Sequence, residues 1–243
     1  MVISSLGSAT MASAQENVTT FGIQLRPIVP NKFVGFESVG GESDGFSSLW
    51  VPRPSMSFGM VIRWGLTKSI SIESGINLLR RNYRMKMSEP ENGLEATIDY
   101  SFIGYELPVQ VLFYVPLSDR WWMNGSGGLS VDTYPSNTFS NTAQRVDTVE
   151  YDFEQFTARR RWAQIAIQAN YGFEYRTKES GYYYLGVTFH RPFGTMANSE
   201  SVLTYVDAIK RNVVELNGTY FTVDLRYFFH EKADLKKAKP KKK

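Results

Sequence analysis

The chain has 243 residues, a formal net charge of +3, 14% aromatic residues and no cysteine. The absence of cysteine excludes disulfides, thiolate metal sites, thiol catalysis and the lipid-modified cysteine of a bacterial lipoprotein. Seven lysines between Glu231 and Lys243 give this tail a charge of +5, so the other residues sum to −2 and the basic balance is no argument for nucleic-acid binding.

The N-terminal residues have the character of an export signal. Val2 to Ala14 is small and apolar, and Ala12-Ser13-Ala14 matches an A-x-A cleavage site, which predicts a signal peptide over residues 1–14 and a mature start at Gln15. The usual basic n-region is missing. The alternatives are a longer signal of which these residues are a part, or a disordered tail.

Alternation of apolar and polar residues is the main signal along the rest of the chain. No stretch reaches the roughly 20 consecutive apolar residues of a transmembrane helix, so a hydropathy scan on its own predicts a soluble protein. Lipid-facing strands escape such scans because only alternate residues need be apolar. Eight runs follow period two: Thr19 to Pro27, Ser55 to Gly65, Ile70 to Arg81, Tyr100 to Val115, Trp121 to Val131, Trp162 to Arg176, Tyr182 to His190, and Phe221 to Phe229. Pro108, inside the fourth run, predicts a bulge or bend there.

The last run shows the pattern most clearly. One face carries only apolar residues and the other carries Thr222, Asp224 and Arg226. The run ends in the paired aromatics Phe228 and Phe229 close to the C-terminus. This combination indicates a closed barrel with its apolar face toward lipid.

The connections between the runs alternate in length. Short turns are expected at 66–69, 116–120 and 177–181. Long connections are expected at 28–54, 82–99, 132–161 and 191–217. Short periplasmic turns and long outer loops are typical of outer-membrane barrels.

These observations predict an all-β fold: an eight-stranded antiparallel up-and-down transmembrane β-barrel in the bacterial outer membrane, over residues 15–230. Residues 231–243 are predicted to form a disordered, lysine-rich periplasmic tail. The competing interpretation is a soluble exported β-sandwich, because a sandwich shares the period-two signal.

The polar faces of the runs would point into the barrel. An eight-stranded barrel is just wide enough for its own side chains to fill it, and charges held there need partners. We therefore expect a plugged interior in which arginines bridge to carboxylates, with Arg63 and Glu73 as one pair. The predicted network comprises Arg26, Arg63, Glu73, Glu106, Gln110, Gln164, Gln168, Glu174, Asp224 and Arg226, together with Gln24, Asn77 and Asn170.

Aromatic residues gather at the short-turn ends of the runs. Such residues form girdles at the membrane interfaces of barrels. The predicted periplasmic girdle comprises Trp64, Trp121, Trp122, Tyr182, Tyr184 and Phe229.

One hairpin resembles a known family. Gly104-Tyr105-Glu106-Leu107-Pro108-Val109-Gln110-Val111, followed by a short turn and Trp122-Met123-Asn124-Gly125-Ser126-Gly127-Gly128, is similar to the strand 4 to strand 5 hairpin of the PorT-like, or porin-like, outer-membrane β-barrel family. The resemblance implies the barrel fold, and for some members a role in type IX protein secretion. It implies no catalytic residue.

Catalytic and metal-binding groups are sparse. A serine hydrolase needs a base, and His190 and His230 are the only histidines. Neither has a visible nucleophile and orienting carboxylate nearby in the sequence, and their places at opposite ends of the predicted barrel prevent a shared ion. Glu89, Glu91 and Glu95 are expected to be a solvated acidic loop. We predict no catalytic residue, metal or cofactor.

The favoured function is a non-enzymatic outer-membrane scaffold or accessory protein of a secretion or surface-assembly system. Its expected partners are outer-membrane lipid and a protein that contacts the outer loops or periplasmic turns, with no nucleic acid. The basic tail would attach to an anionic periplasmic surface. The alternatives are a narrow channel for small solutes or ions and a lipid-modifying barrel enzyme.

Overall fold

The computed structural model describes residues 18–30, 38–177, 180–206 and 208–229. The signal peptide expected at 1–14 and the tail expected at 231–243 lie outside these residues. The described residues form thirteen strands and one short 3-10 helix, η2 (Pro90–Asn92). The strands are β1 (Thr19–Val29), β2 (Val39–Ser43), β3 (Phe46–Gly65), β4 (Ile70–Glu89), β5 (Leu94–Pro116), β6 (Trp121–Thr133), β7 (Thr138–Val146), β8 (Val149–Arg159), β9 (Ala163–Arg176), β10 (Tyr182–Pro192), β11 (Ala197–Tyr205), β12 (Ala208–Leu216) and β13 (Tyr220–Phe228).

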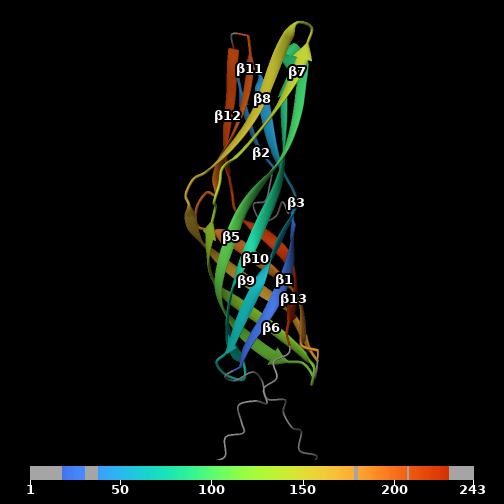
Figure 1. Cartoon of the computed structure of the whole chain (residues 1–243), viewed down its shortest axis with the longest axis vertical. Helices are drawn as coiled ribbons and strands as arrows, with labels where there is room; N and C mark the ends of the chain where they lie inside the picture. Colours follow the sequence, from blue (N-terminus) through green and yellow to red (C-terminus); the bar gives the residue numbers. More distant parts are fainter. Residues whose placement is uncertain (1–17, 31–37, 178–179, 207, 230–243) are drawn as a thin grey trace, which may run out of the picture.

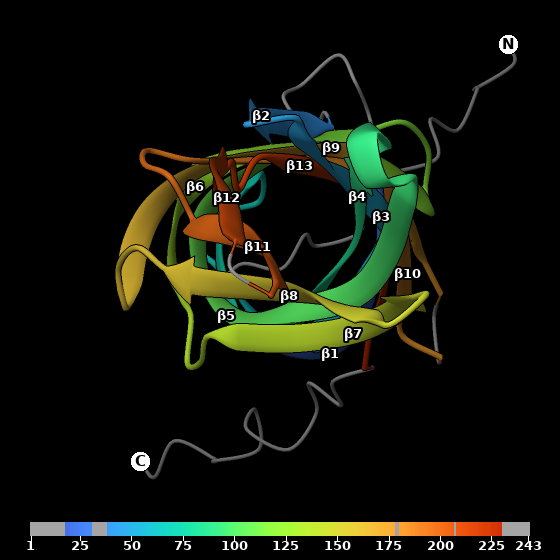
Figure 2. The same cartoon turned by 90° about the horizontal axis from the view of Figure 1, so that it is seen from above.

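All strand pairings are antiparallel, which confirms the predicted all-β class. The eight predicted runs coincide with β1, β3, β4, β5, β6, β9, β10 and β13. Each of these strands pairs with the next along the chain, and β13 pairs with β1. Ile23 of β1, for example, lies opposite Met60 on one side and Tyr227 on the other. The eight pairings therefore form a closed circuit, which Figure 2 shows from above as a ring of strands.

The prediction of eight strands is too low, and the expected long loops are wrong. The segments between the runs contain β2, β7, β8, β11 and β12, and β3, β4 and β5 continue far beyond the predicted runs. Strands β12, β11, β8 and β7 pair in that order as a separate four-stranded sheet. Figure 1 shows this sheet and β2 at one end of an elongated molecule, joined to the ring by the long strands β3 to β5. We call this end the outer extension.

The long strands reverse their polarity part-way along. In the first half of β4 the outward residues are apolar, such as Ile76, and the inward residues are polar, such as Glu73 and Asn77. Beyond Leu79 the same inward face carries buried apolar residues such as Met85. The outward face there carries Arg80, Asn82, Arg84 and Lys86. The ring is thus polar inside and apolar outside, whereas the extension has the opposite arrangement.

The apolar inner face of the extension forms the largest hydrophobic core of the described residues. It joins side chains from β3, β4, β5, β8, β11 and β12, including Trp50, Met85 and Phe153. Burial of these side chains supplies the driving force for folding the extension. The alternation within the expected loops was the sequence signal for these strands, because period two holds whichever face is apolar.

The start of β1 and the end of β13 lie at the end of the ring opposite to the extension. Gly65 donates a backbone hydrogen bond to Val18, and Phe229 donates one to Phe21, beside the short turn at 66–69. No helix within the described part of the chain is long and apolar enough to cross a membrane.

Candidate functional site

The interior of the ring holds the charged residues predicted to lie there. Arg26, Arg63, Glu73, Glu106 and Glu174 come from five different strands and point inward. Asp224 and Arg226 join them from β13, because the inward face of each strand carries every second residue. None of these side chains is more than 7% exposed.

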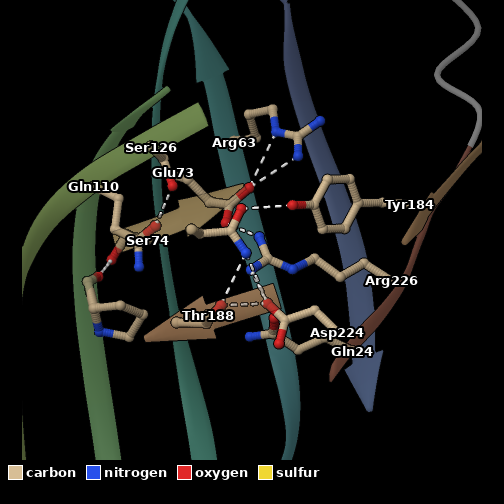
Figure 3. Close-up of polar contacts among 12 residues, drawn as sticks. Gln24, Arg63, Glu73, Ser74, Gln110, Ser126, Tyr184, Thr188, Asp224 and Arg226 are labelled. Carbon is tan, nitrogen blue, oxygen red and sulfur yellow. Dashed lines mark hydrogen bonds and ion pairs between the residues drawn. The ribbon is translucent and has the colours of Figure 1, made fainter. Parts of the chain in front are cut away.

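These charges form a continuous series of ion pairs, which begins near the short-turn end. Arg176 Nε lies 2.6 Å from Glu174, whose other oxygen lies 2.6 Å from Arg63 Nη1. Arg63 Nη2 is 3.0 Å from Glu73, so the predicted pair is present. Glu73 then pairs with Arg226. Figure 3 shows Arg63, Glu73 and Arg226 converging in the interior.

The series continues toward the outer extension. Arg226 Nη2 lies 2.7 Å from Asp224, and Asp224 lies 3.4 Å from Arg26 Nε. Arg26 Nη1 is 2.6 Å from Glu106. Four arginines therefore alternate with four carboxylates, and the series as a whole is neutral. Such pairing offsets the large cost of removing each charge from water.

Neutral polar side chains form further hydrogen bonds to the carboxylates of the series. Asp224 accepts hydrogen bonds from Asn170 at 2.9 Å and from Thr188 at 2.5 Å. Tyr184 donates to Asn170 at 2.5 Å. Glu106 accepts from Asn77 at 2.9 Å, and Asn77 accepts from Gln24 at 2.5 Å. Hydrogen bonds of this kind help to hold the carboxylates in one arrangement.

The predicted glutamines lie in two places. Gln110 donates to Gln168 at 2.5 Å and accepts from Ser126 at 2.6 Å, beside the ion-pair series. Gln164 lies nearer the extension and donates to Tyr134 at 2.9 Å. Gln164 therefore links the ring to the core of the extension, to which Tyr134 belongs.

Aromatic residues close the interior at the short-turn end. The Arg176 guanidinium lies 4.3 Å from the ring of Trp122, 5.2 Å from Tyr114 and 5.5 Å from Tyr182. Cations are attracted to aromatic faces at such distances. Arg176 is thus held by stacking as well as by Glu174.

This arrangement corrects half of the predicted girdle. Trp122, Tyr182 and Tyr184 point inward. The Arg226 guanidinium carbon lies 4.9 Å from the centroid of the Tyr184 ring. Trp122 and Asn124 are two residues apart on β6, so their side chains lie on the same, inward face of the strand. The alternation in the sequence therefore already placed Trp122 inside the ring. Trp64, Trp121 and Phe229 are about half exposed on the outer surface of the ring.

A second polar cluster lies at the outer end of the series, and the sequence interpretation missed it. His190 Nε2 lies 3.0 Å from Asp132 and 3.3 Å from Ser130 Oγ, and Ser130 donates to Asp132 at 2.9 Å. His190 therefore has a serine and a carboxylate in contact, although neither lies near it in the sequence. Ser130 and Asp132 come from β6, which pairs with β9 and not with β10, so the contact crosses the ring interior.

The cluster does not have the geometry of a catalytic triad. A triad places the carboxylate on one ring nitrogen and the nucleophile on the other. Here Ser130 and Asp132 both face Nε2 of His190, and Nδ1 has no hydrogen-bond partner among the described residues. All three side chains are buried.

Glu106, Asp132 and His190 also offer three ligand atoms within 4.8 Å of one another, the spacing of a metal site. Both carboxylate oxygens of Glu106 are already engaged, Oε1 by Arg26 and Asn77 and Oε2 by Tyr220. A metal ion would have to displace these donors and sit beside the Arg26 charge. The hydrogen bonds that join His190 Nε2, Ser130 and Asp132 account for the cluster with the groups present.

Arg81 and Tyr220 complete the junction. Arg81 is buried, donates to the carbonyl of Gly218 at 2.9 Å and lies 4.7 Å from the ring of Tyr220. Tyr220 stacks on His190 with 4.4 Å between ring centroids. Arg81 and Glu73 are separated by an even number of residues on β4, so the Arg81 side chain also points into the interior.

Comparisons with known proteins give likeness in structure alone. Scans against protein-family models and against curated proteins give no match. The outer membrane protein OprG from Pseudomonas aeruginosa matches with a TM-score of 0.52 and 8% identity, over 90% of this chain and 99% of that one. The fold is that of an outer-membrane β-barrel protein. The outer membrane protease OmpT from Escherichia coli matches with a TM-score of only 0.31 and 10% identity, over 87% of this chain and 93% of that one.

At these identities the likeness establishes the fold alone. This fold is the one with which bacterial outer-membrane proteins cross the membrane, and to that extent it confirms the predicted location in the bacterial outer membrane. The narrower resemblance to the PorT-like family finds no counterpart in these comparisons.

Proposed function

We propose that this protein is a non-enzymatic, integral outer-membrane scaffold. In this proposal the ring is an eight-stranded transmembrane barrel closed to diffusion, and it holds the outer extension outside the cell as a surface for a protein partner. The observation that carries the proposal is the neutral series of ion pairs across the interior.

The outer surface of the ring supports insertion into a membrane. Outward residues on β5 are apolar from Ile103 to Val115, which corresponds to about 40 Å of strand, or roughly 29 Å of height at a tilt of about 45°. Apolar residues cover the outward faces of the neighbouring strands in the same way, for example Met60 on β3. A belt of this height matches the hydrocarbon core of a bilayer.

The interior supports closure. Side chains with little exposure lie at three levels: the stacked Arg176, 12% exposed, at the short-turn end, the buried ion-pair series, and the apolar core of the extension. A diffusion pore needs a continuous wet passage, and the low exposure of the side chains at these levels opposes such a passage. Closure thus places the function on the outer surfaces.

The extension supports a role in binding. Its core is hydrophobic and its β4–β5 tip is fixed to β12 by an ion pair between Glu89 and Lys210. Burial alone would raise the pKa of Glu89, but hydrogen bonds from Lys210 and Asn92 outweigh it and hold that pKa below its ordinary value. A rigid surface loses little entropy on binding a partner.

Conductance across a planar bilayer tests closure. We expect the purified wild-type protein to give no discrete single-channel steps. The wild type is compared with the double variant Glu73→Ser with Arg226→Ser. This variant removes one carboxylate and one arginine and keeps the interior neutral. Water entering the vacated space should make this variant measurably more conductive than the wild type.

Regular single-channel steps from the wild-type protein would contradict closure and favour the alternative, a narrow channel for small solutes or ions. A gel-mobility shift on boiling confirms that each sample is a folded barrel before it is measured. Crosslinking in native outer membrane, with and without the hairpin at 197–216, tests whether the extension is the surface that binds a partner.

A further inference from the structure

A polar cleft opens on the outer face of β3, β4 and β5, where the ring meets the extension. It has a volume of about 460 Å³, and its lining includes Arg53, Arg80, Asn82, Asp99 and Ser101. Nothing in the closed interior or in the proposed partner surface accounts for two arginines at this place.

The strand registers place the cleft at the upper edge of the apolar belt. Arg80 lies opposite the outward-facing Met56 on one side and the outward-facing Ile103 on the other. Arg53, Asn82 and Ser101 form the next outward row, about 7 Å farther along the strands. If the belt spans the hydrocarbon core, this row lies at the depth of the lipid headgroups.

Hydrogen bonds hold the floor of the cleft in position. Arg80 donates from Nε and Nη2 to Ser101 Oγ at 3.2 Å each. Ser101 donates to Asn82 at 2.8 Å, and Asn82 donates to the carbonyl of Pro54 at 2.8 Å. Pro54 lies in the β-bulge of β3, where the register shifts between Arg53 and Met56. The bulge turns the strand so that Arg53 faces outward beside Arg80.

The cleft carries a positive charge. Its one carboxylate, Asp99, accepts two hydrogen bonds from Arg84, at 2.7 and 2.6 Å, and these bonds hold the pKa of Asp99 below its ordinary value. Arg84 and Asp99 thus cancel each other. Within the described residues neither Arg53 nor Arg80 has a carboxylate within ion-pair distance, so the cleft keeps a net charge of +2.

We propose that this cleft binds the phosphate group of a phosphorylated outer-leaflet lipid, whose acyl chains lie on the apolar belt directly below. Two guanidinium groups offer several donors each to the oxygens of one phosphate. Met56, Leu78 and Ile103 provide the apolar surface for the chains. The proposal rests on the proposed insertion of the ring into the membrane, and it adds a specific lipid contact.

Lipid retention by the purified full-length protein tests the proposal. The probe is lipid A with two phosphates, mixed into detergent micelles, and native mass spectrometry counts the molecules that stay bound. We expect the double variant Arg53→Gln with Arg80→Gln to retain about tenfold less of this lipid at low salt, and Lys at both positions to restore part of the binding. The matched control, Arg145→Gln with Arg211→Gln on β7 and β12, removes the same charge and should behave as the wild type.

Equal retention by the wild type and the Arg53, Arg80 double variant would overturn the proposal. Equal retention of lipid A and its dephosphorylated form would overturn it too, because the acyl chains alone would then account for binding. Competition by millimolar inorganic phosphate, with no dependence on acyl chains, would assign the cleft to free phosphate instead. Partitioning into membranes and the gel shift on boiling report on the barrel separately, so failure of the lipid site is distinguished from failure of membrane insertion.

Discussion

At the scale of single residues, the interior is organised by alternation of charge. Each internal member of the series contacts two groups of opposite sign: Arg63 contacts Glu73 and Glu174, and Glu73 contacts Arg63 and Arg226. Arg63 also lies 3.8 Å from the ring of Phe228. Loss of Arg63 therefore leaves Glu73 and Glu174 with one arginine each.

Substitution of Arg63 tests this arrangement. Arg63→Met should lower the free energy of unfolding by about 3 to 5 kcal/mol, because it removes one of the two arginines that each of the buried carboxylates Glu73 and Glu174 contacts. The double variant Arg63→Met with Glu73→Leu should cost less than the sum of the single variants, with a coupling of about 0.5 to 3 kcal/mol. Urea unfolding in detergent measures all three variants. Additive effects would show that the two side chains act independently.

At the scale of elements, close approach between strands depends on glycine. A methyl group at Gly128 of β6 would lie 2.1 Å from the carbonyl oxygen of Val109 and 2.7 Å from Cα of Gln110 on β5. The register of β5 with each of its neighbours is the same on both sides of Pro108, so the bulge expected there is wrong. The bulge of this part of the sheet lies in β3, after Arg53.

Gly128→Ala should therefore destabilise the ring by about 1 to 3 kcal/mol, because β5 must move away to make room for the methyl group. Gly125→Ala on the same strand is the matched control, since its methyl group would have no atom nearer than 4.0 Å. The temperature at which the boiled and unboiled gel bands merge gives the comparison. The same temperature for both variants would be inconsistent with tight packing of β6 on β5.

At the scale of the whole molecule, the chain combines two folding environments. The ring is polar inside and apolar outside, as a membrane requires, and the extension is apolar inside and polar outside, as water requires. Strands β3, β4 and β5 pass from one environment to the other, and the change between Leu78 and Arg80 on β4 marks the boundary.

This division predicts that the extension can be weakened without loss of the ring. Phe153 of β8 is fully buried in the core of the extension, and Phe153→Ala should cost that core about 3 to 5 kcal/mol. Phe139→Ala on β7 is the control, because that ring is 57% exposed. Limited proteolysis should cut the Phe153 variant between 138 and 216 while the ring keeps its gel shift. Loss of the gel shift together with the cleavage would show that the two parts unfold as one unit.

The sequence by itself determined the eight strands of the ring, the short turns between them and the inward charges. All of these depend on period two within one strand, which is local information. The predicted girdle is wrong at Trp122, Tyr182 and Tyr184 because alternation along the strand, and not height in the ring, decides which side chains point inward. The expectation of long loops is wrong because strands with an apolar inner face and a polar outer face also alternate with period two. The same alternation therefore marks the strands of the extension.

Only the tertiary structure decided which groups meet. Arg26 and Glu106 are 80 residues apart in the chain, and Asp132 and His190 are 58 apart, yet each pair lies in contact inside the ring. Pairing of this kind depends on the register and closure of strands that are distant in sequence, and no local pattern encodes it. The cleft beside Arg53 and Arg80 depends on a bulge for the same reason: a shift of register changes the face to which a side chain belongs.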